Sequence, residues 1–147
     1  MKINIKPIGI IHTPYKKPDD VSIRAYRSRK KGRVIVYKKF AEGLDDIDGF
    51  SHITIIFYFH KARGYKLKAI PYRDKVPRGI FAIKGPCRPN HIGITTVRLL
   101  KRIGRELIIR EMDMVDGSPL LDIKPYVPPF DERKNVKIGW LEGKIKR

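Results

Sequence analysis

Short apolar runs separated by turn residues dominate the hydrophobic pattern of this chain. The runs are rich in Ile, Val, Phe and Tyr, and a sustained helical period is hard to find. They predict strands over residues 5–12, 33–37, 52–59, 79–83, 94–103, 106–112 and 120–123. Gly104-Arg105 predicts a tight hairpin turn between two of them. The clearest helical candidate, residues 40–47, is short and has an acidic solvent face.

The run from His52 to His60 shows strict alternation and separates a core face from a mixed face. Alternation places Ile53, Ile55, Phe57 and Phe59 on the core face. The opposite face ends at His60 and lines either a cavity or a subunit interface. Many short strands with one or two short helices predict a mainly β fold, a closed or nearly closed barrel, because closure removes exposed edges.

The length and composition predict one domain. A chain of 147 residues with 41% hydrophobic content can fill a single core. We therefore expect one β-barrel domain over residues 1–147, with residues from about 132 to 147 as a C-terminal tail.

The charge points to an anionic partner. The chain has 33 Lys and Arg against 15 Asp and Glu, a formal charge of +18 that the fold itself does not need. Nucleic acid is the usual reason for such a surplus, ahead of an anionic membrane surface. Thermal adaptation explains part of the charge, but ion-pair networks need both signs and a cation surplus remains.

Two basic segments are candidates for RNA contact. The segment from Arg24 to Arg33 carries six cations in ten residues, and a second set follows His60. We predict that they bind phosphates, and the alternative is that both are solvated loops. Tyr65 and Tyr72 lie in the second segment and either stack on unpaired bases or fold inward. The predicted RNA-binding residues are Arg27, Arg29, Lys30, Lys31, Arg33, Arg63, Lys66 and Lys68.

Several other classes of site are disfavoured. The lone cysteine, Cys87, excludes an internal disulfide and suits a reducing compartment, and no base is established beside it. Neither a Rossmann nor a P-loop glycine motif occurs. The spacing of the histidines predicts no metal site. The N-terminus lacks the apolar run of a signal peptide and no run reaches membrane-spanning length, so we expect a cytoplasmic protein.

Two turn-rich segments, residues 78–93 and 113–126, are the main candidates for a binding site. Each sets a predicted strand beside a turn rich in Gly, Pro, Asn or Asp, which presents polar backbone at the rim of the core. The first gathers Lys84, Arg88 and Asn90 on one loop. The second carries Asp113, Asp116 and Asp122, which form internal salt bridges to Arg88 or Arg98 or recognise a cationic ligand.

The order of these motifs resembles the TsaA/TrmO family of S-adenosylmethionine-dependent tRNA methyltransferases. The resemblance runs in order from residue 8 to about residue 131. The matching pieces are Ile8-Gly-Ile-Ile-His-Thr-Pro-Tyr15, Glu42-Gly-Leu-Asp-Asp-Ile-Asp-Gly-Phe-Ser-His52, Phe59-His-Lys-Ala-Arg-Gly64, Gly79-Ile-Phe-Ala-Ile-Lys84, Arg88-Pro-Asn-His-Ile-Gly93 and Asp113-Met-Val-Asp-Gly-Ser-Pro-Leu-Leu-Asp-Ile-Lys-Pro-Tyr126.

The resemblance implies a single-sheeted, dimeric barrel that binds S-adenosylmethionine. It also implies methyl transfer to the N6 nitrogen of threonylcarbamoyladenosine beside the anticodon of tRNA. By motif, the implied cofactor-binding residues are Ile23, Arg24, Ala25, His60, Lys61, Lys84, Ile94, Val115, Asp116, Gly117 and Ser118. We place Arg88 and Asn90 at the substrate or the loop and Tyr126 in a stacking role. Asp116, His91 or solvent takes the proton, and the catalytic residue stays unassigned.

The chain departs from the family pattern at three places. Lys84 stands where the family often has Arg, His91 where it commonly has Pro, and no Pro-Arg-Gln-type sequence is evident at 23–25. Many members carry a further C-terminal domain, so here either the high charge compensates or the substrate differs. The alternatives are a non-catalytic RNA-binding or ligand-sensing barrel, or a methyltransferase with another acceptor.

Overall fold

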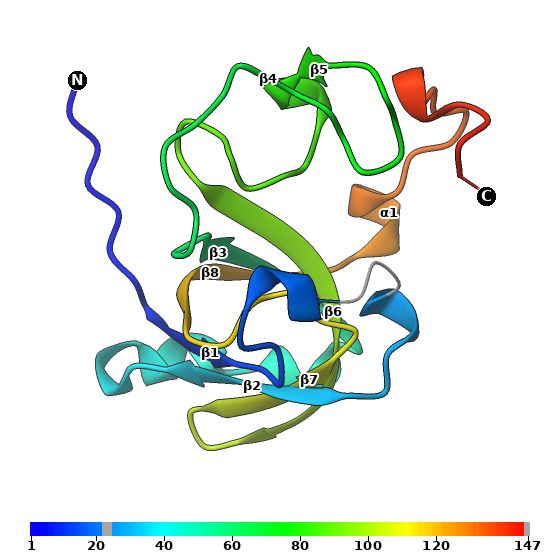
Figure 1. The fold of residues 1–147 in the computed structure, drawn as a ribbon. Coiled ribbons are helices and arrows are strands. Elements are labelled where there is room, and N and C mark those ends of the chain that lie inside the picture. Colours follow the sequence, from blue (N-terminus) through cyan, green and yellow to red (C-terminus); the bar gives the residue numbers. More distant parts are fainter. Residues whose placement is uncertain (22–24, 146–147) are drawn as a thin grey trace.

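Six antiparallel strands close into a barrel with the order β1-β2-β7-β6-β3-β8 (Figure 1). The computed structural model describes residues 1–21 and 25–145. The barrel strands are β1 (Gly9–His12), β2 (Lys31–Val36), β3 (His52–Tyr58), β6 (Ile92–Ile103), β7 (Glu106–Arg110) and β8 (Ser118–Pro125). The predicted closed barrel is confirmed. Closure leaves none of its strands with an unpaired edge.

Short elements decorate the barrel. The ribbon β4 (Lys68–Ala69) and β5 (Arg78–Gly79) lies in the segment between β3 and β6, and α1 (Pro128–Asp131) follows β8. The 3-10 helices are η1 (Pro18–Asp20), η2 (Ala25–Arg27), η3 (Lys38–Leu44), η4 (Ile47–Gly49), η5 (Ile80–Ala82) and η6 (Gly139–Leu141). No helix in the described part of the chain is both long and apolar enough to span a membrane.

The core face follows the predicted alternation. Ile53, Ile55 and Phe57 of β3 are buried, and Phe59 packs against the same cluster. The inward residues of the other strands complete the cluster, among them Ile11, Val34, Val97, Leu107, Ile109 and Leu120. Burying a side chain of this size contributes about 1.5–3 kcal/mol, so this single cluster supplies the main driving force for closure.

Three of the predicted elements are wrong in type or extent. The first strand begins at Gly9 rather than residue 5, because Pro7 has no N–H to donate to a ladder. Residues 79–83 are not a strand: after Gly79 the chain forms η5, which buries Ile80 and leaves Phe81 78% exposed. The segment 40–47 is not an α-helix but η3, which ends before Asp46, a residue with φ of 69°. The predicted turn at Gly104-Arg105 is confirmed.

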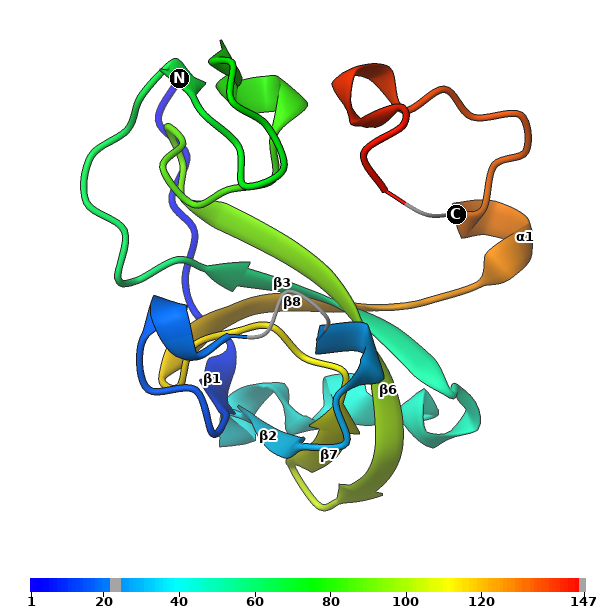
Figure 2. The same cartoon turned by 45° about the vertical axis from the view of Figure 1, so that its right-hand side comes forward.

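The strand directions define two ends of the barrel. At one end, hereafter the loop end, lie His12, Lys31, Tyr58, Ile92 and Ser118. Residues 59–91, hereafter the insert, rise from this end, as the green segment in Figures 1 and 2 shows. The C-terminal segment reaches the insert, where Trp140 Nε1 donates to the Ala82 carbonyl at 2.8 Å and Lys144 Nζ lies 2.7 Å from an Asp74 carboxylate oxygen.

Candidate functional site

A largely apolar hollow of about 420 Å³ opens at the loop end. Strand β3 delivers Phe57 and, just beyond it, Phe59 and His60, while the segment after β7 delivers Asp113 and Val115. The remaining lining residues are Pro18, Val21, Lys61, Ala62, Arg63, Pro86, Cys87 and Ser118. Two of the family motifs, residues 59–64 and 113–126, therefore meet at one cavity of the size that small-molecule sites have.

The floor of the hollow depends on a close approach between Phe57 and Gly93. The two residues are partners across β3 and β6, and a Cβ at position 93 would lie 2.3 Å from Phe57 Cζ. The Phe57 ring also meets Phe59 edge to face, with centroids 5.0 Å apart. Gly93 is thus the residue that lets an aromatic ring lie over the strand at the cavity floor.

His60 brings a polar atom without a partner to this apolar cavity. Its Nδ1 is buried and has no hydrogen-bond partner. Burial lowers the pKa of His60 below 6.5, and the positive charge of Lys61 lowers it further. The Asp116 carboxylate and the Tyr58 backbone oppose the change. The neutral imidazole therefore prevails at pH 7, so a molecule bound in the hollow would meet an uncharged ring.

The turn before β8 is held by its own polar groups. Ser118 Oγ donates to the Val115 carbonyl at 2.6 Å, and the Gly117 N–H donates to the Ile11 carbonyl at 2.8 Å. Gly117 has φ of +82°, a conformation that favours glycine. A Cβ there would lie 3.7 Å from His60 Nε2, an ordinary contact, so the turn passes close to His60 and the backbone conformation alone favours glycine.

Asp116 is anchored rather than free. Its carboxylate accepts from His12 Nδ1 at 3.2 Å, from the Thr13 N–H at 3.0 Å and from Lys16 Nζ at 2.9 Å. Lys16 is the main cause that lowers the pKa of Asp116 to about 2. A carboxylate with so low a pKa is a poor proton acceptor near pH 7, so Asp116 instead fixes the turn to the end of β1.

Asp113 differs from Asp116 in its surroundings. It lines the hollow and remains solvent-accessible, yet the packed walls around it raise the pKa of its carboxyl. A hydrogen bond from the Thr95 side chain and the charge of Lys84 oppose this rise. The expected salt bridges of the three acids to Arg88 or Arg98 are wrong for the described residues, where Asp116 pairs with Lys16 and Asp122 with Lys124.

The turn of residues 84–93 is braced by its own side chains. Arg88 Nη1 donates to the carbonyls of Ile83 at 2.7 Å and Gly85 at 3.2 Å, which suits the loop-forming alternative for this residue. His91, with φ of 48°, donates from Nε2 to the Gly64 carbonyl at 2.6 Å. The positions of Pro86 and Cys87 at the hollow follow from this bracing.

Some predicted residues lie elsewhere. Tyr126 follows β8 at the far end of the barrel, where its ring meets His52 with centroids 6.4 Å apart. Ile94 is exposed on the barrel wall, and Asn90 lines a separate groove beside Ile92. Ala25 is buried beside a neighbouring hollow, whereas Ile23 and Arg24 fall outside the described residues.

The predicted RNA-binding cations flank the loop end. Arg33 Nη1 pairs with Glu106 Oε1 at 3.0 Å, Lys30 Nζ lies 5.3 Å from the Tyr15 ring centroid, and Arg27 Cζ lies 5.4 Å from that of Tyr26. The others are exposed: Arg29, Lys31, Arg63, Lys66 and Lys68. They come from the residues at and just before the start of β2 and from the insert, and Arg63 lines the hollow itself.

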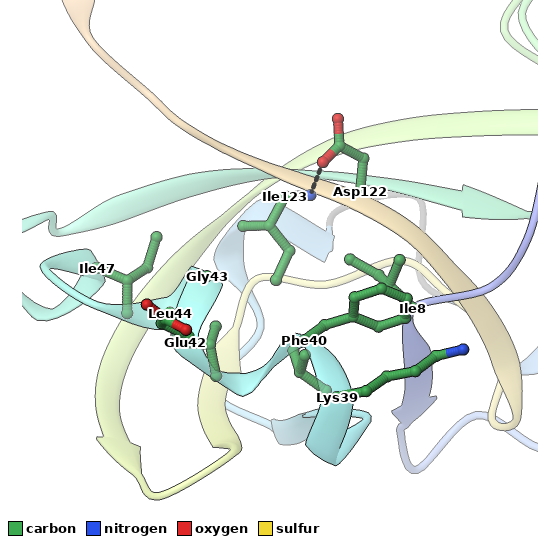
Figure 3. Close-up of a pocket in the computed structure, with 10 residues that line it drawn as sticks. Ile8, Lys39, Phe40, Glu42, Gly43, Leu44, Ile47, Asp122 and Ile123 are labelled. Carbon is green, nitrogen blue, oxygen red and sulfur yellow. Dashed lines mark hydrogen bonds between the residues drawn. The ribbon is translucent and has the colours of Figure 1, made fainter.

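A second cavity, of about 520 Å³, lies at the opposite end of the barrel, under η3. Figure 3 shows Ile123 reaching toward Phe40 and Leu44, while the Asp122 carboxyl turns away from them and accepts the Ile123 N–H at 2.9 Å. None of the predicted cofactor, substrate or RNA residues lines it. Within residues 1–21 and 25–145, no cluster of three or more His, Cys, Asp or Glu could hold a metal ion.

Sequence reasoning missed much of the apolar lining. Pro18, Val21, Phe57, Phe59, Pro86 and Cys87 were not among the predicted site residues, although they line the hollow. The alternation of β3 could have indicated Phe57 and Phe59, because both stand at the end of a core face. Pro18 and Val21 carry no such signal, since they belong to a loop whose path depends on tertiary contacts.

Comparison with known proteins bears on the family of this chain. Residues 10–132 match the family described as the tRNA-methyltransferase O N-terminal domain. A probable S-adenosyl-L-methionine-binding protein of Pyrococcus abyssi is 51% identical over 99% of this chain and 79% of its own length. A mouse tRNA (adenine(37)-N6)-methyltransferase is 34% identical over 90% of this chain but only 33% of its own.

Solved structures share the fold. A crystal structure titled TrmO superposes with a TM-score of 0.82 at 31% identity, over 95% of this chain and 64% of that one. The chain thus spans just under two thirds of that protein. The predicted enzyme class and cofactor, a methyltransferase that uses S-adenosylmethionine, are those that the relatives' names carry. The family predicted from the motifs is confirmed: this chain belongs to the tRNA-methyltransferase O family.

Proposed function

We propose that this protein is an S-adenosylmethionine-dependent methyltransferase that acts on the N6 position of an adenosine beside the anticodon of tRNA. The observation that carries the proposal is the hollow at the loop end, where two of the family motifs meet and which His60, with its buried and unpartnered Nδ1, helps to line. The names of the relatives support the reaction class and the tRNA substrate. The family resemblance adds the threonylcarbamoyl group on the acceptor adenosine.

The residues present fit the cofactor. Phe57, Phe59 and Val115 provide apolar walls, and His60 Nδ1 provides a polar contact that the protein itself leaves unmet. When bound, S-adenosylmethionine supplies an electrophilic methyl group on a sulfonium sulfur. Neutral His60 suits a cationic ligand better than a protonated ring would, because like charges repel. Lys61 and Val115 to Ser118 complete the proposed cofactor site.

The rate must come largely from positioning. The N6 nitrogen of a carbamoylated adenosine is a poor nucleophile because its lone pair is delocalised. A barrel that holds the acceptor at the mouth of a largely apolar cavity removes the entropy cost of orientation, an effect worth about 7–11 kcal/mol at best. The hydrogen bonds of Asp116 and Ser118 hold in place the turn that forms one wall.

Two basic surfaces beside the hollow support tRNA as the partner. The exposed cations before β2 and in the insert would neutralise phosphates on either side of the acceptor nucleotide. Exposed apolar residues on the barrel wall, including Ile92 and Ile94, suit the homodimer that the family resemblance implies, which sedimentation or light scattering would test. A cytoplasmic location remains a prediction.

Calorimetric titration with S-adenosylmethionine tests the proposal, after mass spectrometry has shown that no cofactor co-purified. Stoichiometric binding is expected, and methylation of tRNA is then measured. Cys87, the lone cysteine, lines the hollow and is exposed, so bound cofactor should slow its reaction with a thiol reagent. A folded, cofactor-free protein that neither binds nor protects Cys87 would instead support an RNA-binding barrel without turnover.

A matched pair of variants assigns the binding to this cavity. Val115→Trp fills the hollow and should weaken cofactor binding at least tenfold, because the indole occupies ligand volume. Val76→Trp adds the same side chain at a position that is 50% exposed and not among the lining residues, so it should bind as the wild type does. Equal affinities for the two variants would contradict the assignment.

A further inference from the structure

Another hollow, more open and about 560 Å³ in volume, adjoins the hollow at the loop end, hereafter the cofactor cavity. The two share a wall, because Val21 and Asp113 line both. The other lining residues are Ala25, Tyr26, Tyr72, Gly85, Thr95, Thr96 and Glu111. A methyl transfer needs donor and acceptor sites that meet at one boundary, and Asp113 stands at the boundary between these two cavities.

Two exposed tyrosines flank the open hollow. Tyr26 is 62% exposed and Tyr72 is 79% exposed, and they come from segments far apart in the sequence. Their ring faces offer stacking platforms of the kind that hold unpaired bases. The Arg27 guanidinium over Tyr26 adds positive charge where the phosphates of a bound strand would run.

We propose, resting on the methyltransferase function above, that this open hollow receives the unpaired acceptor adenine between Tyr26 and Tyr72, and that Asp113 accepts the proton from its N6 nitrogen. In this step the nitrogen–carbon bond forms, the sulfur–carbon bond breaks with its electron pair on sulfur, and the N–H proton passes to the carboxylate. A single carboxylate at the shared wall can contact an acceptor in one cavity and lie beside the donor in the other.

The other candidate proton acceptors are less well placed. Asp116 is occupied by Lys16, His12 and the Thr13 N–H, and His91 is not among the residues that line either cavity. The Asp113 carboxyl shares the open hollow with Thr95, and the packed walls around it bring its pKa closer to that of a useful base. The charged or titratable groups around it are Lys84 and the lining residues of the two cavities, which include Glu111, His60, Lys61, Arg63, Tyr26, Tyr72 and Cys87.

RNA binding without cofactor tests the base site independently of catalysis. The probe is an anticodon stem-loop RNA with N6-threonylcarbamoyladenosine, the acceptor of the proposed function, at the position 3′ to the anticodon. Its affinity is measured by fluorescence anisotropy at fixed salt. Tyr26→Ala and Tyr72→Ala should each weaken binding about tenfold. Tyr37→Ala, a tyrosine 42% exposed after β2 and not among the lining residues, is the control and should bind as the wild type does. If Tyr26→Ala and Tyr72→Ala bind the RNA as tightly as Tyr37→Ala and the wild type do, the base site is overturned.

Single-turnover methylation tests Asp113. Asp113→Asn keeps the size but removes the base, so the rate at saturating cofactor and RNA should fall by about 100-fold or more. In this variant, bound cofactor should still slow the reaction of Cys87 with a thiol reagent, which would show that the cofactor cavity is intact. Asp122→Asn changes the charge equally, lines only the opposite cavity, and should keep the wild-type rate.

The outcomes separate this inference from the proposed function. A wild-type protein that methylates no RNA refutes the function, whereas an active wild type with an equally active Asp113→Asn variant overturns only the proton acceptor. Asp113→Glu should recover part of the rate, because it restores a carboxylate one methylene further out. Loss of activity in both variants with intact RNA and cofactor binding would reduce Asp113 to a positioning residue and contradict the proposal.

Discussion

Replacing Gly93 with Ala should destabilise the barrel and deform the cofactor cavity together. The new Cβ would lie 2.3, 2.6 and 2.7 Å from three atoms of the Phe57 ring. Such contacts are closer than van der Waals contact, so the ring or strand β6 must move. Phe57 is buried and meets Phe59 edge to face, which leaves little room in the core and directs the displacement toward the hollow.

The expected magnitude follows from overpacking. Inserting a methyl group into a packed core costs about 1–3 kcal/mol, and each kcal/mol lowers Tm by about 2–4 °C in a domain near this size. We therefore expect a fall in Tm of about 2–12 °C by differential scanning calorimetry. S-adenosylmethionine affinity should fall as well, at a temperature where the variant is fully folded, because the cavity floor has moved.

The matched control is Gly79→Ala, where a Cβ would meet no atom within 4 Å and φ is −57°. It should lose no stability and can gain up to about 1 kcal/mol. In a double-mutant cycle, Phe57→Leu should relieve the clash, so the two changes should couple by about 0.5–3 kcal/mol. Similar stability for the Gly93 and Gly79 variants, or strict additivity with Phe57→Leu, would refute the reasoning.

Three further predictions concern charge. The His60 imidazole should titrate below pH 6.5 by NMR, and a midpoint above 6.5 would contradict this. As pH falls, the unfolded chain takes up the His60 proton before the folded chain does, so the stability that neutral His60 provides should be lost below pH 6.5. Hydrogen bonds from Lys144 and Arg78 hold the pKa of Asp74 well below 3.8, so the stability they provide should be present above that pH and lost below it. Below that pH the C-terminal segment should loosen from the insert, and the fluorescence of Trp140, the lone tryptophan, should shift toward that of a solvated indole. Asp74→Asn should cause the same shift at pH 7. Arg27→Ala should lower the slope of log affinity for RNA against log salt by about 1, and an unchanged slope would remove Arg27 from the phosphate contacts.

The strands were predictable where a buried face alternates with an outer face. Ile53, Ile55 and Phe57 follow that rule and predict both β3 and its inward side. The residues of η5 did not follow it: Ile80-Phe81-Ala82 reads as a strand, but Ile80 alone is buried and its N–H bonds to the Leu67 carbonyl. A short apolar run does not reveal whether one of its residues or every second one reaches the core.

The site was predictable as a set of turns but not as a set of contacts. The turn chemistry of residues 113–118 and 84–93 marked the segments that form the loop end. It did not predict that Asp116 binds Lys16 and His12, because those partners are about one hundred positions away in the sequence. Tyr126 belongs to the same motif as Asp113, yet β8 separates them along the length of the barrel.

A bulge in β8 explains why the motif of residues 113–126 can contribute side chains to both the core and the hollow at the loop end. Phe57 pairs with Leu120 while Ile56 pairs with Asp122, so Leu121 is the extra residue on β8. The extra residue restores inward alternation on both sides: Leu120 is buried before it, and Ile123 packs on the core after it. Without it, a register set by Ile123 would turn Leu120 and Ser118 to the outer face, since a one-residue slip reverses every side chain. The bulge therefore lets one strand close the barrel at its far end and still aim Ser118 into the hollow at the other.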